Sequence, residues 1–352
     1  MKEKNLLTPY ISNLIKIIAL LMMFCHHFLR TDSWVVGDNG FVSLFHLGGL
    51  TLESFLCDVG KLCVGIFAVL SGYGLYFSLV RDDSFKRIIS RLIKFLINYW
   101  IVFFVIFTPC FFLVGNHISI KELIDSFLTI NPTINMFSWY VHFYVIAVPM
   151  LWLYHKSLNK IQNKSTVLWI TIILCFCMPF VNTGISCLID DWLDYFPSML
   201  TGYLFARYQL LDKGVLKIES NIAGLPQFFL GLSGGGVVLV MRFLVARLTS
   251  WRIYTQFDAV FAIAFVFCLL VSLRRISESY SRAVSKIGKA TANMWYLHAI
   301  FFGAYAEKLQ WIAYLPRYSF PVIIWVFCLL LPVALLIDCA VSGNKNRNRL
   351  RQ

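Results

Sequence analysis

The sequence predicts an all-α protein, a polytopic bundle of about ten transmembrane helices. Apolar residues make up 59% of the 352 residues, charged residues only 14%, and the mean hydropathy is +0.72. The apolar stretches are continuous rather than alternating, which favours helices over the strands of a membrane barrel. Because hydrocarbon offers no hydrogen-bond partner to backbone amides, we expect each stretch to form a helix within the bilayer.

Ten stretches of about twenty apolar residues are long enough to cross the hydrocarbon core. The expected spans cover residues 11–29, 62–80, 95–114, 134–154, 167–182, 194–211, 222–243, 257–273, 290–306 and 319–341. The first stretch is interpreted as a retained span, since it lacks the small-residue cleavage site of a signal peptide. The seventh is the weakest helix, because Pro226 and the run from Gly234 to Gly236 lower its helix propensity.

Lysine and arginine lie mostly on one side of this arrangement. With ten spans, 23 of the 31 basic residues fall on the side that holds both termini. Such an asymmetry marks the cytoplasmic side. We therefore expect a multi-pass protein of the cell (inner) membrane with both termini cytoplasmic. Residues 1–341 would form a single transmembrane domain, and residues 342–352 a short basic cytoplasmic tail.

The charge and the cysteines argue against two other classes of protein. The net charge of +13 comes from short loops that lack the aromatic and basic pattern of a nucleic-acid-binding module, so no nucleic-acid partner is expected. Most of these cations are explained by the retention of positive loops on the cytoplasmic side and by attraction to anionic lipid. Cys175 and Cys177 would lie about 200° apart on a helix and cannot form a metal pair, and we expect no bound metal.

Ionisable groups inside a span are costly, so each is a functional candidate. Lys16 and His27 are eleven positions apart, which is about three helical turns, and they share one helix face. His26 points about 80° away. The two groups lie about 16 Å apart along the axis, so a long phosphate-bearing ligand could bridge them where an ion pair could not. Alternatively, Lys16 reaches the lipid headgroups and the histidines hydrogen-bond between helices.

Weaker signals follow along the chain. Arg91 and Lys94 lie one helical turn apart and suit phosphate oxygens, but they also fit ordinary anchoring at the cytoplasmic surface. The remaining candidates have an equally simple structural explanation in helix packing, an interfacial aromatic belt or a structural hydrogen bond. They are Ser71, Gly72 and Tyr73, the pair Trp139 and Tyr140, and His298.

Taken in order, these features resemble the acyltransferase-three family of bacterial membrane O-acyltransferases. The pattern of a basic residue, ten positions and a histidine is matched by Lys16 and His27, although the family usually has arginine at the first position. The family's paired arginines are similar to Arg91 and Lys94, with lysine again in place of arginine. The later landmarks are matched by Phe67 and Leu70 to Tyr73, by Trp139 and Tyr140, by Phe196, Pro197 and Gly202, and by Tyr296 to His298.

The resemblance implies transfer of an acyl group, most often acetyl from acetyl-CoA, to a hydroxyl of a surface or exported polysaccharide or its lipid-linked precursor. His27 would be the catalytic residue, acting as a general base or through a covalent acyl-histidine. Lys16, Arg91 and Lys94 would hold the CoA phosphates. His26, Ser71, Tyr73, Trp139, Tyr140 and His298 would line the channel or the substrate site.

Two other functions stay open on the sequence alone. Intramembrane Lys and His also mark substrate paths, so a transporter or flippase for a lipid-linked sugar is the main alternative. A non-catalytic membrane partner is the third. For the acyltransferase, the expected partners are acyl-CoA, a carbohydrate acceptor and the bilayer, and polysaccharide-assembly proteins or a second copy of the chain are further candidates.

Overall fold

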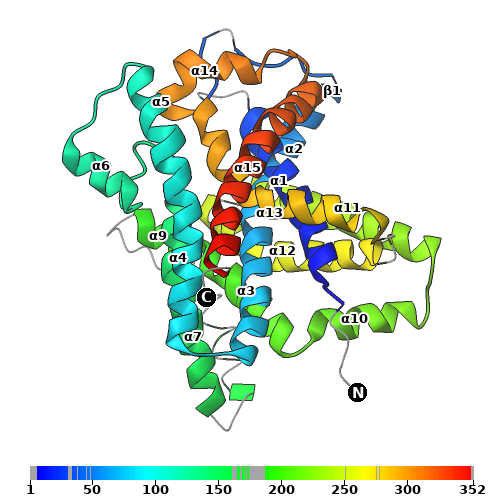
Figure 1. Cartoon of the computed structure of the whole chain (residues 1–352). Helices are drawn as coiled ribbons and strands as arrows, with labels where there is room; N and C mark the ends of the chain where they lie inside the picture. Colours follow the sequence, from blue (N-terminus) through cyan, green and yellow to red (C-terminus); the bar gives the residue numbers. More distant parts are fainter. Residues whose placement is uncertain are drawn as a thin grey trace. The chain divides into compact units, whose positions relative to one another are not determined.

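The computed structural model shows a chain that is almost entirely helical (Figure 1). It describes residues 6–160, 165, 166, 169, 171, 173, 187–249 and 251–349, except residues 31–33, 38, 45, 48, 275 and 277. The predicted all-α class is confirmed, with one small addition. Strands β1 (His46–Leu47) and β2 (Leu50–Thr51) form a short antiparallel pair.

Five helices are long and apolar enough to cross a membrane, among the described residues. They are Pro9–Phe28, Leu52–Arg81, Phe85–Leu113, Leu225–Leu248 and Ser319–Val341, and they correspond to the first, second, third, seventh and tenth predicted spans. A sixth span results if Phe257–Leu273 and Glu278–Phe301 form one broken span. The protein is therefore a helical membrane protein, and the total of ten spans stays a prediction.

Three more predicted spans fall on helices, namely α7 (Trp139–Lys160), α9 (Cys187–Arg207) and α12 (Trp251–Leu273). The fifth predicted span, with Cys175 and Cys177, lies largely outside the described residues. The ninth, residues 290–306, is not one continuous helix. Helix α13 (Ser281–Leu297) passes into the 3-10 turns η4 (His298–Phe301) and η5 (Gly303–Tyr305), because Phe302 is extended and Gly303 has a φ of 58°.

The chain divides into two compact units. The first comprises residues 1–19, 62–90 and 143–281. Its core is the contact between α3 (Cys63–Arg81) and α9. Gly72 faces the backbone of Met199, and Gly202 faces the backbone of Val69, so closely that neither glycine has room for a Cβ atom. Gly72 therefore serves close helix packing, the structural explanation that the sequence offered for the Ser71–Gly72 element.

In the same unit, α11 (Leu225–Leu248) lies beside α12 (Figure 1). Gly231 packs directly against the backbone of α12, and Pro226 occupies the first turn, where a proline costs no helical hydrogen bond.

Arg242 forms a bidentate ion pair with Asp258, with N···O distances of 3.0 and 3.1 Å. Both side chains are buried, so this intramembrane charge is paired within the protein.

Helix α10 (Leu210–Glu219) completes the first unit. The Asp212 carboxylate on α10 accepts the backbone N–H of Leu6 at 2.8 Å and so fixes the start of the chain. At the other end of α10, Glu219 pairs with Arg274.

The second unit comprises residues 20–61, 91–142 and 282–352. It holds the end of α1 (Pro9–Phe28), α2 (Leu52–Gly60), most of α4 (Phe85–Val102), the π-helical turn η1 (Phe103–Phe107), α5 (Thr108–Leu113), α6 (Ile120–Phe127), α14 (Ala306–Ala313) and α15 (Ser319–Arg349). Helix α15 continues beyond residue 341, where the basic tail was expected to begin.

Buried polar side chains fasten the segments of this second unit together. The Glu53 carboxylate accepts hydrogen bonds from the Ser43 hydroxyl, the Leu44 amide and the Ser319 hydroxyl at 2.6 to 2.9 Å. The Tyr305 hydroxyl donates to a carbonyl oxygen of η1 and to the carbonyl of Ile134. These bonds satisfy backbone groups that a bilayer could not.

Candidate active site

His27 lies in the last turn of α1, inside a cage of aromatic rings. Its side chain is 8% exposed. The Trp34 ring stacks on the imidazole with a centroid distance of 5.5 Å and an interplanar angle of 13°. Phe137 and Phe302 approach to centroid distances of 4.4 and 5.9 Å. The loop after α1, the start of α7 and the turn after η4 therefore bring these rings to one buried imidazole.

A second histidine completes the cage. His298 is fully buried, and its ring centroid lies 5.0 Å from that of His27. His298 begins η4 directly after α13, and its Nδ1 bonds to the carbonyl oxygen of Trp295. The Phe137 ring stacks on His298 with a centroid distance of 4.5 Å, so this one ring contacts both imidazoles. The sequence predicted neither this pairing of the two imidazoles nor the aromatic residues around it.

The hydrogen bond to Trp295 defines the chemistry of His298. A carbonyl can only accept, so Nδ1 of His298 carries the proton and Nε2 of the neutral ring keeps a lone pair. Nε2 of His298 and Nδ1 of His27 are both buried, and neither has a hydrogen-bond partner among the described residues. Buried polar atoms are normally paired, so two such nitrogens on neighbouring rings suit a ligand that brings hydroxyl groups.

His26 differs from its neighbour. Its Nδ1 lies 2.8 Å from the carbonyl oxygen of Cys57 on α2, and the Cys57 thiol in turn contacts the carbonyl of His26 at 3.4 Å. Gly60, one helical turn further along α2, packs against the backbone of Met22 and His26. His26 therefore holds α1 against α2, whereas His27 turns into the aromatic cage.

The predicted phosphate-binding cations lie on two helices. Lys16 is half-buried on α1, which runs without a break from Lys16 to His27, as the eleven-residue spacing requires. Arg91 is half-buried and Lys94 is exposed, one turn apart on α4. Their role in holding phosphates stays a prediction.

The other predicted lining residues have mixed surroundings. Tyr73 is buried, and its hydroxyl points to the Asp212 carboxylate at 3.5 Å. Ser71 on the same helix is half-buried. Trp139 is half-buried, and the buried Tyr140 ring lies 5.3 Å from that of Trp295, the residue whose carbonyl holds His298. Tyr140 therefore adjoins the histidine pair through Trp295.

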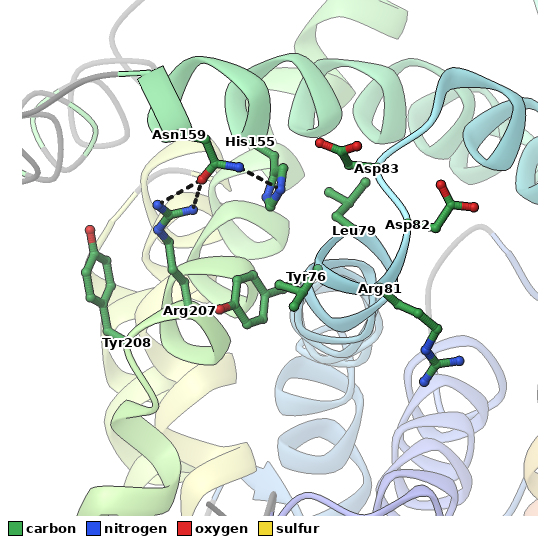
Figure 2. Close-up of a pocket in the computed structure, with 10 residues that line it drawn as sticks. Tyr76, Leu79, Arg81, Asp82, Asp83, His155, Asn159, Arg207 and Tyr208 are labelled. Carbon is green, nitrogen blue, oxygen red and sulfur yellow. Dashed lines mark hydrogen bonds between the residues drawn. The ribbon is translucent and has the colours of Figure 1, made fainter. Parts of the chain in front are cut away.

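A separate pocket of about 640 Å³ opens in the first unit (Figure 2). Its walls come from the C-terminal ends of α3, α7 and α9. The distribution of basic residues predicts that these ends face the cytoplasm, and this orientation stays a prediction. The pocket is lined by Tyr76, Leu79, Val80, Arg81, Asp82, Asp83, His155, Asn159, Arg207 and Tyr208. Sequence reasoning did not single out His155, Asn159 or Arg207.

Ion pairs neutralise the carboxylates of this pocket. Asp83 pairs with Lys156 at 2.6 Å, and Asp82 lies 3.8 Å from Arg87. The hydrogen bond from Lys156 lowers the pKa of Asp83, and hydrogen bonds from Ser84 lower that of Asp82. Both carboxylates are therefore charged, and each is paired with a basic side chain.

Comparison with known protein families gives one match. The family model described as an acyltransferase domain matches residues 10–340, nearly the whole chain. The chain belongs to the acyltransferase-three family. It is thus a membrane acyltransferase, which requires an acyl donor and an acceptor. Searches of curated proteins and of solved structures found no match.

In this acyltransferase, the aromatic cage is the part of the site that only the structure reveals. Trp34, Phe137 and Phe302 come from three segments far apart in the sequence, and no local pattern connects them. The described residues include no group of three or more His, Cys, Asp or Glu side chains that could hold a metal ion. The reactive groups that the described part of the site offers are the two imidazoles.

Proposed function

We propose that this acyltransferase moves acetyl from acetyl-CoA to a hydroxyl of a cell-surface or exported polysaccharide, or of its lipid-linked precursor. The observation that carries the proposal is the buried pair of imidazoles, each with a nitrogen that has no hydrogen-bond partner among the described residues. A hydroxyl is a poor nucleophile at neutral pH, and a neutral imidazole is the side chain best suited to remove its proton.

In the proposed reaction, His27 accepts the hydroxyl proton while the hydroxyl oxygen attacks the thioester carbonyl. The tetrahedral intermediate then collapses with cleavage of the carbon–sulfur bond. The thiolate of CoA leaves and takes the proton from the imidazolium, which returns His27 to its neutral state. The aromatic cage of Trp34, Phe137 and Phe302 supports this role, because it excludes water that would otherwise hydrolyse the thioester.

His298 is the proposed partner of the acceptor hydroxyl. Its Nε2 lone pair can accept a hydrogen bond from the sugar, while the Nδ1 bond to Trp295 keeps the ring in place. Ser71, Tyr73, Trp139, Tyr140 and His26 are proposed to line the path of the acceptor or to support that lining. Lys16, Arg91 and Lys94 are proposed to hold the phosphates of the donor by charge.

The proposed reaction joins two sides of the membrane. Acetyl-CoA is a cytoplasmic metabolite in this proposal, and the acceptor lies on the outer side of the inner membrane. The proposed topology has ten spans with both termini in the cytoplasm. It is supported by the 23 basic residues that share one side in that arrangement.

His27→Ala tests the proposal. We expect the variant to insert into the membrane and to lose transfer by about 10²- to 10⁴-fold, the usual contribution of a general base. The measurement is acetyl transfer in membranes with labelled acetyl-CoA, together with mass spectrometry of the surface glycans for an acetyl-sized difference. His142→Ala is the matched control, since His142 is a half-buried histidine of the second unit outside the aromatic cage. A His27→Ala protein with normal transfer would refute the assignment.

A further inference from the structure

The pocket at the ends of α3, α7 and α9 presents a guanidinium group that no carboxylate neutralises in the described part of the chain. Arg207 donates from both terminal nitrogens to the Asn159 side-chain oxygen at 3.2 Å, and from one of them to the Tyr203 hydroxyl at 3.3 Å. Both acceptors are uncharged. A guanidinium has five N–H donors, so these three hydrogen bonds leave donors for a ligand.

The surrounding hydrogen bonds fix the direction in which Arg207 points. The Asn159 amide nitrogen donates to Nε2 of His155 at 3.1 Å, which orients the Asn159 oxygen toward Arg207. Nδ1 of His155 then lies 2.7 Å from the Tyr203 hydroxyl. This closed network of four side chains comes from α7 and α9. It holds the guanidinium in place before any ligand binds, which lowers the entropic cost of binding.

The distribution of charge in the pocket favours an anion near Arg207. Figure 2 shows Asp82 and Asp83 at the opposite end of the pocket from Arg207, and the Arg81 guanidinium pointing away from it. Both carboxylates already have cationic partners. A ligand at the Arg207 end therefore meets a guanidinium group whose hydrogen-bond acceptors are uncharged.

We propose that this pocket binds a phosphate group through Arg207, in addition to the donor contacts of Lys16, Arg91 and Lys94. Guanidinium groups match phosphate oxygens in charge and geometry. Tyr76 and Tyr208 add aromatic surface beside the guanidinium, which suits a ligand that carries a planar base next to its phosphates. On the proposed function, the ligand is the nucleotide end of the acyl-CoA donor. The same chemistry could be met by the phosphate of a lipid headgroup.

The experiment is an equilibrium binding measurement on the full chain in a phosphate-free maltoside detergent. The probes are coenzyme A, pantetheine, which lacks the nucleotide, and phosphatidylglycerol added to the micelles. Arg207→Gln removes the positive charge. Asn159→Ala keeps that charge but removes the side-chain oxygen to which the guanidinium donates. Arg282→Gln is the matched control, because Arg282 is an exposed arginine of the other unit. Size-exclusion profiles and melting temperatures show whether each variant is folded.

We expect Arg207→Gln to weaken binding of coenzyme A by about ten- to a hundredfold, the effect of hydrogen bonds to a charged group. Asn159→Ala should weaken it less, and Arg282→Gln and the affinity for pantetheine should not change. Equal coenzyme A binding by folded Asn159→Ala and Arg207→Gln proteins and by the unaltered chain would overturn the site while leaving the proposed function intact. If Arg207→Gln loses binding of phosphatidylglycerol but keeps that of coenzyme A, the ligand of this pocket is a lipid headgroup and not the acyl-CoA donor. An unaltered chain that binds no coenzyme A would refute both proposals.

Discussion

At the scale of single residues, the two histidines of the cage differ in what holds them. His298 is fixed by the carbonyl of Trp295, so its tautomer is set by the backbone. No hydrogen bond to Nδ1 of His27 is found among the described residues, and this ring stacks on Trp34 and contacts Phe137. The less constrained ring can reorient around a substrate, which suits a group that first accepts a proton and later returns it.

His298→Asn tests whether His298 positions the acceptor through Nε2 or only fills space in the aromatic cage. The Asn amide can still donate to the Trp295 carbonyl, but it lacks the second ring nitrogen. We expect the variant to fold and to lose transfer by roughly 10²-fold or more if Nε2 accepts from the acceptor hydroxyl. The loss should appear in kcat as well as in the KM for the acceptor, with the KM for acetyl-CoA unchanged. Full activity of the Asn variant would reduce His298 to a packing residue.

At the scale of the helices, small residues determine how closely α3 and α9 approach. Gly72 and Gly202 lie at the contact, each against backbone of the other helix. Gly74 is on the same helix as Gly72 but is exposed, with nothing near the position of a Cβ atom. Gly72 and Gly74 are therefore a natural pair for comparison.

Gly72→Ala should destabilise the protein, whereas Gly74→Ala should not. The added methyl at residue 72 would overlap the Met199 backbone, and relieving it by moving the helices should cost about 1–3 kcal/mol. At residue 74 alanine only improves helix propensity, by up to about 1 kcal/mol. Melting temperatures in detergent, or the yield of monodisperse protein, report the difference. Equal stability of the two variants would contradict the close approach of α3 and α9.

At the scale of the whole molecule, the proposed topology would bring a donor from one side of the membrane and an acceptor from the other to the same protein. The pocket of the first unit gathers the ends of α3, α7 and α9, and the sequence placed the loops that follow these helices on the same side as the termini. The side of the membrane that this pocket faces stays a prediction. An even number of spans would return the C-terminus to the side of the N-terminus.

Reporter fusions test the position of the termini. A fluorescent protein fused after Gln352 should be fluorescent, and alkaline phosphatase at the same place should be inactive, because the phosphatase folds only outside the cytoplasm. A phosphatase fused within the loop after α11, at Thr249, should be active. An active phosphatase at the C-terminus would place that end outside the cytoplasm and would overturn the proposed orientation.

The sequence by itself determined that this is a helical membrane protein of the acyltransferase-three family. Continuous apolar stretches and the spacing of Lys16 and His27 are local properties, and helical geometry converts them directly into spans and a shared face. The local pattern also predicted a span over residues 290–306. Within that range the helix breaks at Phe302 and Gly303, a feature of the backbone that hydropathy does not register.

Only the tertiary structure decided which side chains meet. His298 lies 271 positions from His27 along the chain, and its neighbours in the cage come from loops and helix ends that carry no periodic pattern. The same holds for Arg207, whose partner Asn159 belongs to another helix. Contacts between distant segments depend on how helices pack, and that packing is a property of the folded chain rather than of any one stretch of it.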